Sequence, residues 1–444
     1  MYFTWLLHFF RYSRKRGFVN ILKEVLTHEV YPALGCTEPI AVAYAASIAA
    51  NEIAGPVSEI KITVDPGVYK NGMAVTIPNT GGLHGNLVAG VLGALIKKPA
   101  LKMEVLQTVS KAMISKARKL IQSKKARLSY DPSKTILYIE VLVKSKNETA
   151  RAIIEHNHTN CIYLEKNNNV LFSQREKMQT YKVQSYKKLL KRMTIAELID
   201  AVRKMNKDDY SFVKQGIDMN LSAAEAGKQL KKVGYYLVDL VKKGYLTDDI
   251  FSSSKIIVGA ASDARMAGLN FPVMASGGSG NQGIVAILVP FNVGKYFNIP
   301  EKKVLQSIAL SHLINSYIKC FTGDLSPLCG CSIAAGVGAA VAIVYQLTGK
   351  NMKKITLAVN NLISDLGGML CDGAKGGCAL KVVSSADSAI RSAYMAVNNH
   401  GITEYEGFVG KTAEETIKNL SAISEIGMAK VDDTILGIMK GKKL

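Results

Sequence analysis

The chain has 444 residues, of which 48% are hydrophobic and 37 are glycine, so it can form two or three folded domains and is not a disordered protein. Lysine and arginine (56) outnumber the acidic residues (35), which gives a formal net charge of +21. The sequence nevertheless lacks a zinc finger, an RNP motif and a helix-turn-helix signal, and aromatic residues make up only 7%. We therefore interpret the charge as a solvated basic face and expect no nucleic-acid partner.

Residues 1–16 place an apolar run before a basic run, which is the reverse of a secretory signal, and they are too few to span a bilayer. We expect them to form an extension outside the fold. Two uncharged runs, 267–294 and 325–349, are long enough to span a membrane, but polar and glycine-rich turns interrupt both. They are expected to be core segments, without stable membrane insertion. Seven cysteines with no obvious disulfide framework indicate a reducing cytoplasm.

The first pattern that suggests chemistry is G-C-T-E-P, which follows a short predicted helix over residues 18–28. Gly35 breaks the chain, Cys36 or Thr37 can cap a helix, and Pro39 suits its first turn. Cys36 is therefore expected at the start of an alanine-rich buried helix, beside Glu38. A helix N-terminus favours a thiolate, although an inert capping turn would look the same in sequence.

Residues 57–80 have strand character and end in the loop P-N-T-G-G-L-H-G-N. Asn79, Thr80 and His84 lie in this glycine-bracketed loop, ahead of a small-residue helix over 87–96. Backbone N–H groups and hydroxyls in such a loop can bind a carboxylate. A single loop histidine is as often structural as functional.

Residues 101–195 are typical of a separate α/β unit. A basic helix is expected over 104–123, and the strands are expected at 126–131, 135–145, 148–156 and 161–166. His156, His158 and Cys161 could resemble a metal site, but no further ligand accompanies them, so we interpret them as ordinary strand residues. Residues 182–192 form a predicted charged connector.

From Thr194 onward the pattern is almost entirely helical. Thr194 and Glu197 form a capping box, and another helix is predicted over 222–243. The later loop S-G-G-S-G-N-Q-G offers many N–H groups, together with Ser276 and the amides of Asn281 and Gln282. Its composition resembles anion-binding loops, including those that hold the phosphate of pyridoxal phosphate, but a simple turn is the alternative.

Four of the seven cysteines fall between residues 328 and 381, in C-G-C-S-I-A-A-G and C-D-G-A-K-G-G-C-A-L-K. Cys329, Cys331, Cys371 and Cys378 each have glycine nearby, which suits close approach to a bulky inorganic group. Clustered thiols favour a soft metal or an iron–sulfur site, whereas the seven-residue step from Cys371 to Cys378 suits structural zinc poorly. Three or four ligands are possible, and reduced core cysteines are the alternative.

Five motifs occur in one order: G-C-T-E-P-I-A-V-A, P-N-T-G-G-L-H-G-N, S-G-G-S-G-N-Q-G, C-G-C-S-I-A-A-G and C-D-G-A-K-G-G-C-A-L-K. Together they resemble the L-cysteine desulfidase family, which is related to the alpha domain of iron–sulfur L-serine dehydratases, from about residue 21 to about residue 439. The resemblance implies a [4Fe–4S] cluster held by Cys371, Cys378 and Cys329, with Cys331 as the alternative to Cys329. It also implies Cys36 as the proton acceptor, and a possible homodimer.

The implied reaction converts L-cysteine to pyruvate, ammonia and hydrogen sulfide, with an open iron as Lewis acid. L-Serine dehydration is the alternative, and a pyridoxal-phosphate lyase and an RNA-binding protein are more distant rivals. The expected substrate-binding residues share a place in these loops: Thr37, Glu38, Asn79, Thr80, His84, Ser276 and Asn281.

We expect an α+β fold in which a smaller α/β domain is inserted into a mostly helical domain. The predicted division is an extension at 1–16, a helical iron–sulfur domain at 17–55 and 195–444, and an α/β domain at 56–194. The loop with Asn79 and His84 is expected to face the cysteines.

Overall fold

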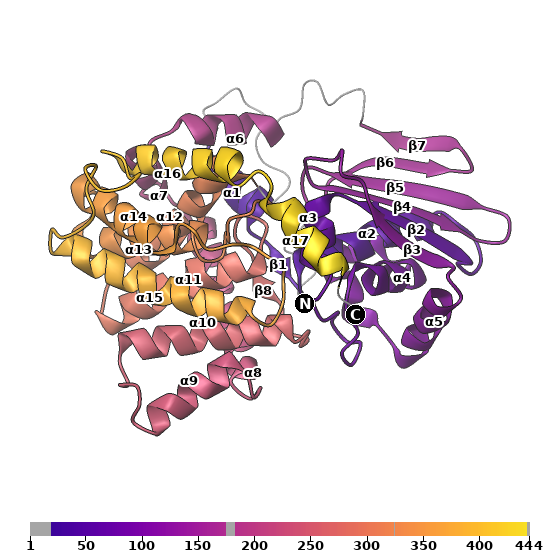
Figure 1. The fold of residues 1–444 in the computed structure, drawn as a ribbon, viewed down its shortest axis with the longest axis horizontal. Coiled ribbons are helices and arrows are strands. Elements are labelled where there is room, and N and C mark those ends of the chain that lie inside the picture. Colours follow the sequence, from indigo (N-terminus) through magenta and orange to yellow (C-terminus); the bar gives the residue numbers. More distant parts are fainter. Residues whose placement is uncertain (1–18, 175–182, 324, 442–444) are drawn as a thin grey trace.

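The computed structural model describes residues 19–174, 183–323 and 325–441. It has an α+β fold in which a mostly helical body lies beside a smaller unit built on a mixed sheet (Figure 1). The expected fold class is therefore confirmed. The extension predicted at residues 1–16 lies outside the described residues.

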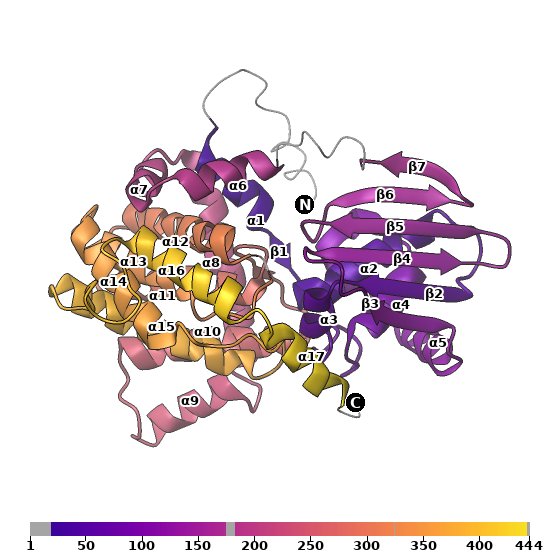
Figure 2. The same cartoon turned by 45° about the horizontal axis from the view of Figure 1, so that its top comes forward.

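The sheet of the smaller unit has the strand order β3-β2-β4-β5-β6-β7. Strand β2 runs parallel to β3 and antiparallel to β4, and the pairs from β4 to β7 are all antiparallel. The strands are β2 (Glu59–Val64), β3 (Ala126–Tyr130), β4 (Tyr138–Lys144), β5 (Thr149–Glu155), β6 (Cys161–Lys166) and β7 (Asn169–Ser173). Helices α2 (Thr37–Asn51), α4 (Asn86–Ile96) and α5 (Lys111–Gln122) lie on one side of the sheet (Figure 2).

Three local predictions in this unit need correction. The strand expected over 57–80 ends at Val64, because Asp65 caps helix α3 (Pro66–Gly72) by accepting hydrogen bonds from the N–H groups of Gly67 and Val68. The helix expected over 104–123 is a 3₁₀ segment (Pro99–Thr108) followed by α5, which Ser110 caps. The charged connector is a helix, α6 (Val183–Arg192).

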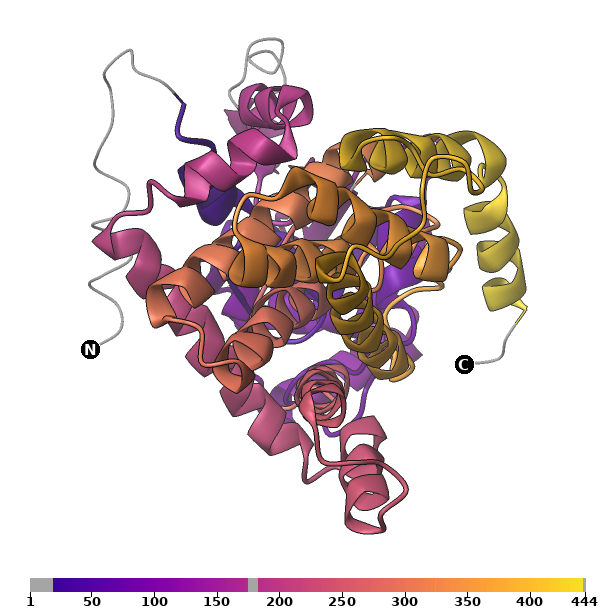
Figure 3. The same cartoon turned by 90° about the vertical axis from the view of Figure 1, so that its left-hand side faces the viewer.

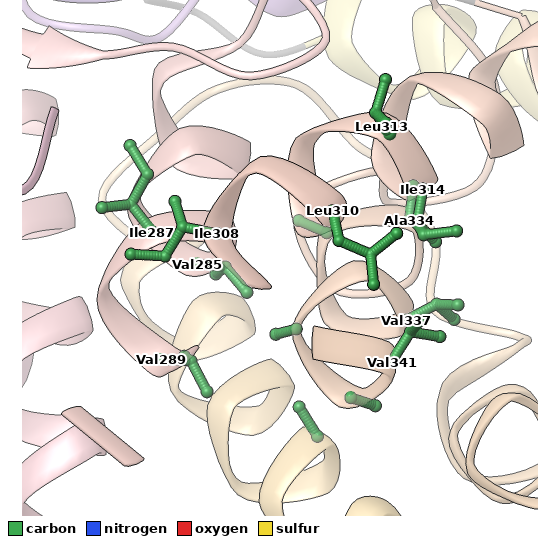
Figure 4. Packing of buried hydrophobic residues seen from close by; sticks show 14 of the residues in the cluster. Val285, Ile287, Val289, Ile308, Leu310, Leu313, Ile314, Ala334, Val337 and Val341 are labelled. Atoms are coloured by element: carbon green, nitrogen blue, oxygen red, sulfur yellow. The ribbon is translucent and has the colours of Figure 1, made fainter. Parts of the chain in front are cut away.

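The helical body packs around three central helices, α11 (Gly280–Tyr296), α12 (Glu301–Thr322) and α13 (Ala334–Thr348). Figure 4 shows apolar side chains from all three, such as Val285, Ile308 and Val337, and each of these is fully buried. Burial of this apolar surface is the main force that holds the body together. The two uncharged runs contribute α11 and α13 to this core, as expected. No helix among the described residues is long and apolar enough to cross a membrane.

Further helices surround this core, and Figure 3 views them from the side of the helical body. They are α1 (Ile21–Glu29), α6, α7 (Ile195–Val202), α8 (Lys207–Gly227), α9 (Val233–Lys242), α10 (Ile250–Met266), α14 (Met352–Leu366), α15 (Cys378–Val397), α16 (Ala413–Ala422) and α17 (Val431–Lys440). The capping box of Thr194 and Glu197 at the start of α7 is confirmed. The helix expected over 222–243 is wrong, because the chain breaks after α8 and resumes as α9.

The packing of α1 and α6 shows where the smaller unit is inserted in the sequence of the helical body. Both helices contact α12 of the helical body. Because α1 precedes the strands of the sheet in sequence and α6 follows them, the smaller unit is inserted between two segments of the helical body. Helix α2 instead packs on the sheet and α4, and its side chains belong to the core of the smaller unit. The range 17–55, expected for the helical domain, therefore includes one helix that packs with the sheet. A short pairing of β1 (Pro32–Ala33) with β8 (Val273–Met274) ties the start of α2 to the loop before α11.

Candidate active site

A cavity lies where the two parts of the molecule meet, with about 920 Å³ of empty space including its open mouth. The smaller unit and the loop before α2 contribute Cys36, Glu38, Asn71 and His158 to its wall. The helical body contributes the glycine loop before α11, the end of α12 and both cysteine loops. The cavity is therefore built from segments that are hundreds of residues apart in sequence.

The two cysteine loops are joined by their backbones. The Cys329 N–H donates to the carbonyl of Met369 (2.8 Å), and the Cys371 N–H donates to the carbonyl of Pro327 (2.7 Å). Cys378 begins helix α15. As a result, all four cysteines of the region line one cavity as free thiols: Cys329, Cys331, Cys371 and Cys378.

The thiols differ in acidity because they interact with one another. The Cys331 thiol donates a hydrogen bond to the Cys329 sulfur, and this bond, aided by the Lys381 cation, lowers the pKa of Cys329 to about 6. The same hydrogen bond and burial raise the pKa of Cys331 well above its usual value. Burial raises the pKa of Cys371 to about 11. Of these four thiols, Cys329 therefore has the lowest pKa.

The four cavity cysteines can be compared with the two kinds of metal site that cysteines form, single-ion sites and iron–sulfur clusters. Among residues 19–174, 183–323 and 325–441, no three His, Cys, Asp or Glu side chains converge in the manner of a single-ion site. The four thiols instead line one cavity. Each cysteine of an iron–sulfur cluster binds a different iron, so its donors surround a space and do not meet at a point. Four soft thiols on one wall thus have the donor chemistry that a thiolate-bound cluster requires.

Cys36 occupies the N-cap position of α2, as expected. Its Sγ donates to Oε2 of the buried Glu38 (2.9 Å), and the same oxygen accepts from the Thr37 hydroxyl (3.1 Å). The amide of Asn71 donates to Oε1 of Glu38 (3.1 Å). These three donors hold the carboxylate in one orientation.

The electrostatics of this pair differ from the thiolate expected at Cys36. Burial, and next the Glu38 carboxylate, raise the pKa of Cys36 well above its usual value. Burial opposes ionisation of Glu38, but the nearby His158 and the hydrogen bond from Cys36 outweigh it and lower the pKa of Glu38. These directions agree with the hydrogen bond, in which the thiol donates and the carboxylate accepts, and burial together with the neighbouring Glu38 outweighs the helix terminus.

Of the expected substrate-binding residues, Glu38 and Asn281 line the cavity. Thr37 lies behind Glu38 and contacts it through its hydroxyl. Ser276 is fully buried beneath the glycine loop, where its Oγ lies 2.8 Å from Nδ1 of His312 and accepts from the amide of Asn315. Ser276 therefore supports the loop and does not line the cavity.

The loop with Asn79, Thr80 and His84 does not line the cavity, contrary to expectation. Each of its three polar side chains contacts another residue of the smaller unit. Asn79 donates to the carbonyl of Leu106, Thr80 donates to that of Ile77, and Nε2 of His84 lies 3.2 Å from the Thr76 hydroxyl. The contacts of Thr80 and His84 stabilise the turn, that of Asn79 joins the turn to the 3₁₀ segment, and all three side chains lie outside the cavity.

Several cavity residues were not predicted from sequence: Asn71, His158, Arg265, Lys319 and Lys381. Asn71 was hidden in a segment interpreted as a strand, which is helix α3. His158 was interpreted as a strand residue, but it lies in the turn between β5 and β6. Arg265 had one signal, a single cation within a run of small residues in α10.

A family model described as the serine dehydratase alpha chain matches residues 100–437. The chain belongs to the serine dehydratase alpha chain family. The matched range includes the four cysteines between residues 328 and 381, and it begins after Cys36. Membership in this family points to a dehydratase-like lyase.

Several relatives match this chain over nearly its whole length. A UPF0597 protein of Geobacter sulfurreducens is 58% identical over 425 residues, which cover 96% of this chain and 99% of the relative. A UPF0597 protein of Elusimicrobium minutum is 54% identical over 424 residues, covering 96% and 100%. A UPF0597 protein of Alkaliphilus oremlandii is 38% identical over 426 residues, covering 95% and 98%.

Proposed function

We propose that this chain is an iron–sulfur lyase that eliminates the β-substituent of a small α-amino acid. The observation that carries the proposal is the meeting of four thiols and the Cys36–Glu38 pair in one cavity. Our first candidate substrate is L-cysteine, which would give pyruvate, ammonia and hydrogen sulfide. The description of the matched family favours a second candidate, L-serine, which would give pyruvate, ammonia and water.

We propose that Cys371, Cys378 and Cys329 hold a [4Fe–4S] cluster, with Cys331 as the alternative to Cys329. When bound, such a cluster supplies an open iron that acts as a Lewis acid on the leaving group. The support lies in the chemistry of the donors, because soft thiols from two backbone-linked loops line the same wall. Free thiols also favour a reducing compartment, so we propose a cytoplasmic location, and the resemblance to the dehydratases favours a homodimer.

The protein's own part in the reaction is to move the α-proton of the substrate. Cys36 can accept this proton only after passing its own to Glu38, whose Oε2 lies 2.9 Å from the sulfur. Asn71 and Thr37 keep the carboxylate oriented for that transfer. Burial of the pair excludes bulk water, which would otherwise compete for the proton.

Anaerobic purification tests this function directly. We expect about four iron atoms and four acid-labile sulfides per chain, as the formula of the cluster requires, and a broad visible absorbance that air bleaches. Pyruvate formation from L-cysteine and from L-serine, with sulfide release from L-cysteine, would identify the leaving group. An internal aldimine band in the visible spectrum, without iron, would contradict the proposal and favour a pyridoxal-phosphate enzyme.

Cysteine variants test the assignment of ligands. Cys371→Ser and Cys378→Ser should lose cluster iron and turnover, because a hydroxyl is a harder and weaker ligand than a thiolate. Cys161→Ser and Cys320→Ser are matched controls, since neither residue lines the cavity, and both should retain iron and activity. Full iron content in Cys371→Ser would rule out its role as a ligand.

A further inference from the structure

Arg265 is a buried cation in the wall of the cavity. It lies near the end of α10, and only 2% of its surface is exposed. None of the ion pairs among the described residues includes Arg265. Removing a charge from water without a counter-ion costs several kcal/mol, so a buried, unpaired arginine indicates a ligand that supplies the negative charge.

The guanidinium has unused hydrogen-bonding capacity. Of its five N–H donors, Nη1 donates to Oδ1 of Asn281 (3.1 Å), while Nε has no partner among the described residues. Gly280 leaves room for this arrangement, since a Cβ at that position would lie 2.3 Å from Nε. The glycine loop is thus shaped around the guanidinium and brings the Asn281 amide beside it.

The Glu38 carboxylate, which also lines the cavity, already has hydrogen-bond partners other than Arg265. Glu38 accepts hydrogen bonds from Cys36, Thr37 and Asn71, and it influences Arg265 only through space. The cavity wall therefore presents Arg265, a cation without an ion pair, and Glu38, an anion that is already hydrogen-bonded. An α-amino acid, with its negative carboxylate and positive ammonium, has the charges that complement both.

We propose that Arg265 binds the α-carboxylate of the substrate, with the Asn281 amide as a second donor. The planar fork of an arginine matches the two oxygens of a carboxylate, which orients the amino acid as well as attracting it. The choice of an amino acid rests on the proposed function, but binding of a carboxylate at Arg265 does not depend on turnover.

Calorimetric titration with L-alanine and L-alaninamide tests this role. Neither has a leaving group on its β-carbon, and the two differ in the carboxylate. We expect the anaerobic wild-type protein to bind L-alanine about 10- to 100-fold more tightly than L-alaninamide, the range typical of hydrogen bonds to a charged group. Arg265→Gln should remove this preference by weakening L-alanine binding alone. Arg265→Lys should be intermediate, because it keeps the charge and loses the fork.

A second variant, Asn281→Asp, gives the guanidinium a carboxylate within the protein. It should weaken L-alanine binding as much as Arg265→Gln does while leaving the melting temperature unchanged or higher. Arg151→Gln, which removes a partly buried guanidinium from the sheet, is the matched control and should leave the affinities for both ligands unchanged.

The proposal is overturned if L-alanine binds either site variant as tightly as it binds the wild type. It is also overturned if the wild type shows no preference, or if both ligands weaken equally. An absence of lyase turnover together with the expected preference would reject the proposed function and retain this inference.

Discussion

Cys36 and Glu38 share one proton, and their contacts assign a separate task to each. The sulfur faces the cavity, while the carboxylate is fixed by Thr37 and Asn71. A thiol that hydrogen-bonds to a carboxylate can exchange its proton for one taken from a substrate, because the carboxylate receives the displaced proton. Neither residue alone has this property, so the pair is the chemical unit.

Substitutions in the pair separate proton transfer from cluster binding. Cys36→Ser and Glu38→Gln should each retain cluster iron and L-alanine binding. Each should reduce turnover and exchange of the substrate α-hydrogen with solvent by about 10²- to 10⁴-fold, the usual contribution of general-base catalysis. Iron analysis and isotope exchange on one anaerobic sample measure both properties.

Glu52→Gln and Cys320→Ser are matched controls for these variants, since both positions lie outside the cavity. Normal exchange in Cys36→Ser would eliminate Cys36 as the base and leave Glu38 as the candidate. A change in the cluster spectrum of Cys36→Ser before substrate is added would instead identify Cys36 as a cluster ligand.

At the scale of elements, the crossing of α2 and α4 determines where the Cys36–Glu38 pair lies. Gly93 on α4 meets the backbone of α2 so closely that a Cβ there would lie 2.0 Å from the carbonyl oxygen of Ala43. Glycine thus allows the two backbones to touch, and the contact positions the start of α2 at the cavity. The same helix pair forms much of the core beneath the sheet.

Alanine substitutions test this contact. Gly93→Ala should lower the free energy of unfolding by about 1–3 kcal/mol, because the added methyl forces the helices apart. Gly437→Ala in the exposed part of α17 is the control. No atom lies near its missing Cβ, so it should raise the free energy of unfolding by about 0.5–1 kcal/mol. Urea denaturation followed by circular dichroism measures both values. An unchanged midpoint for Gly93→Ala would show that the helices can separate without cost.

At the scale of the whole molecule, α17 lies between the helical body and the smaller unit (Figure 1). Lys70 of α3 is 2% exposed and donates both to Oδ1 of Asp432 (2.5 Å) and to the carbonyl of Cys371 (3.0 Å). Lys440 lies over the ring of Tyr130 at the sheet (4.5 Å to its centre). One buried ammonium therefore links the smaller unit, a cysteine loop and the C-terminal helix.

Removing the carboxylate should loosen this junction. Asp432→Ala leaves the Lys70 ammonium buried without its counter-ion, and we expect a loss of about 3 kcal/mol in the free energy of unfolding. It should also release iron faster to a chelator, because Lys70 supports the Cys371 loop. Asp433→Ala, at the exposed neighbouring position, is the control and should change neither property. If the double variant Lys70→Met/Asp432→Leu regains wild-type stability, the unpaired charge is the cause. An unchanged free energy of unfolding and an unchanged rate of iron release in Asp432→Ala would contradict the role of this ion pair.

The sequence by itself determined features that depend on neighbouring residues. The chemistry of capping predicted Cys36 at the start of α2 and the capping box of Thr194, and the uncharged runs predicted the core segments that contain α11 and α13. Such features follow from sequence because capping and helical periodicity act over a few residues.

Only the tertiary structure decided which of these features meet. It brought Arg265 and His158 to the cavity, left the loop of Asn79 and His84 outside it, and packed α2 on the sheet. It also determined that Cys36 keeps its proton, since that depends on its burial beside Glu38. The physical reason is that the role of an ionisable group depends on its burial and its nearest charges. Those charges come from segments far apart in the chain, and sequence spacing does not encode their distances.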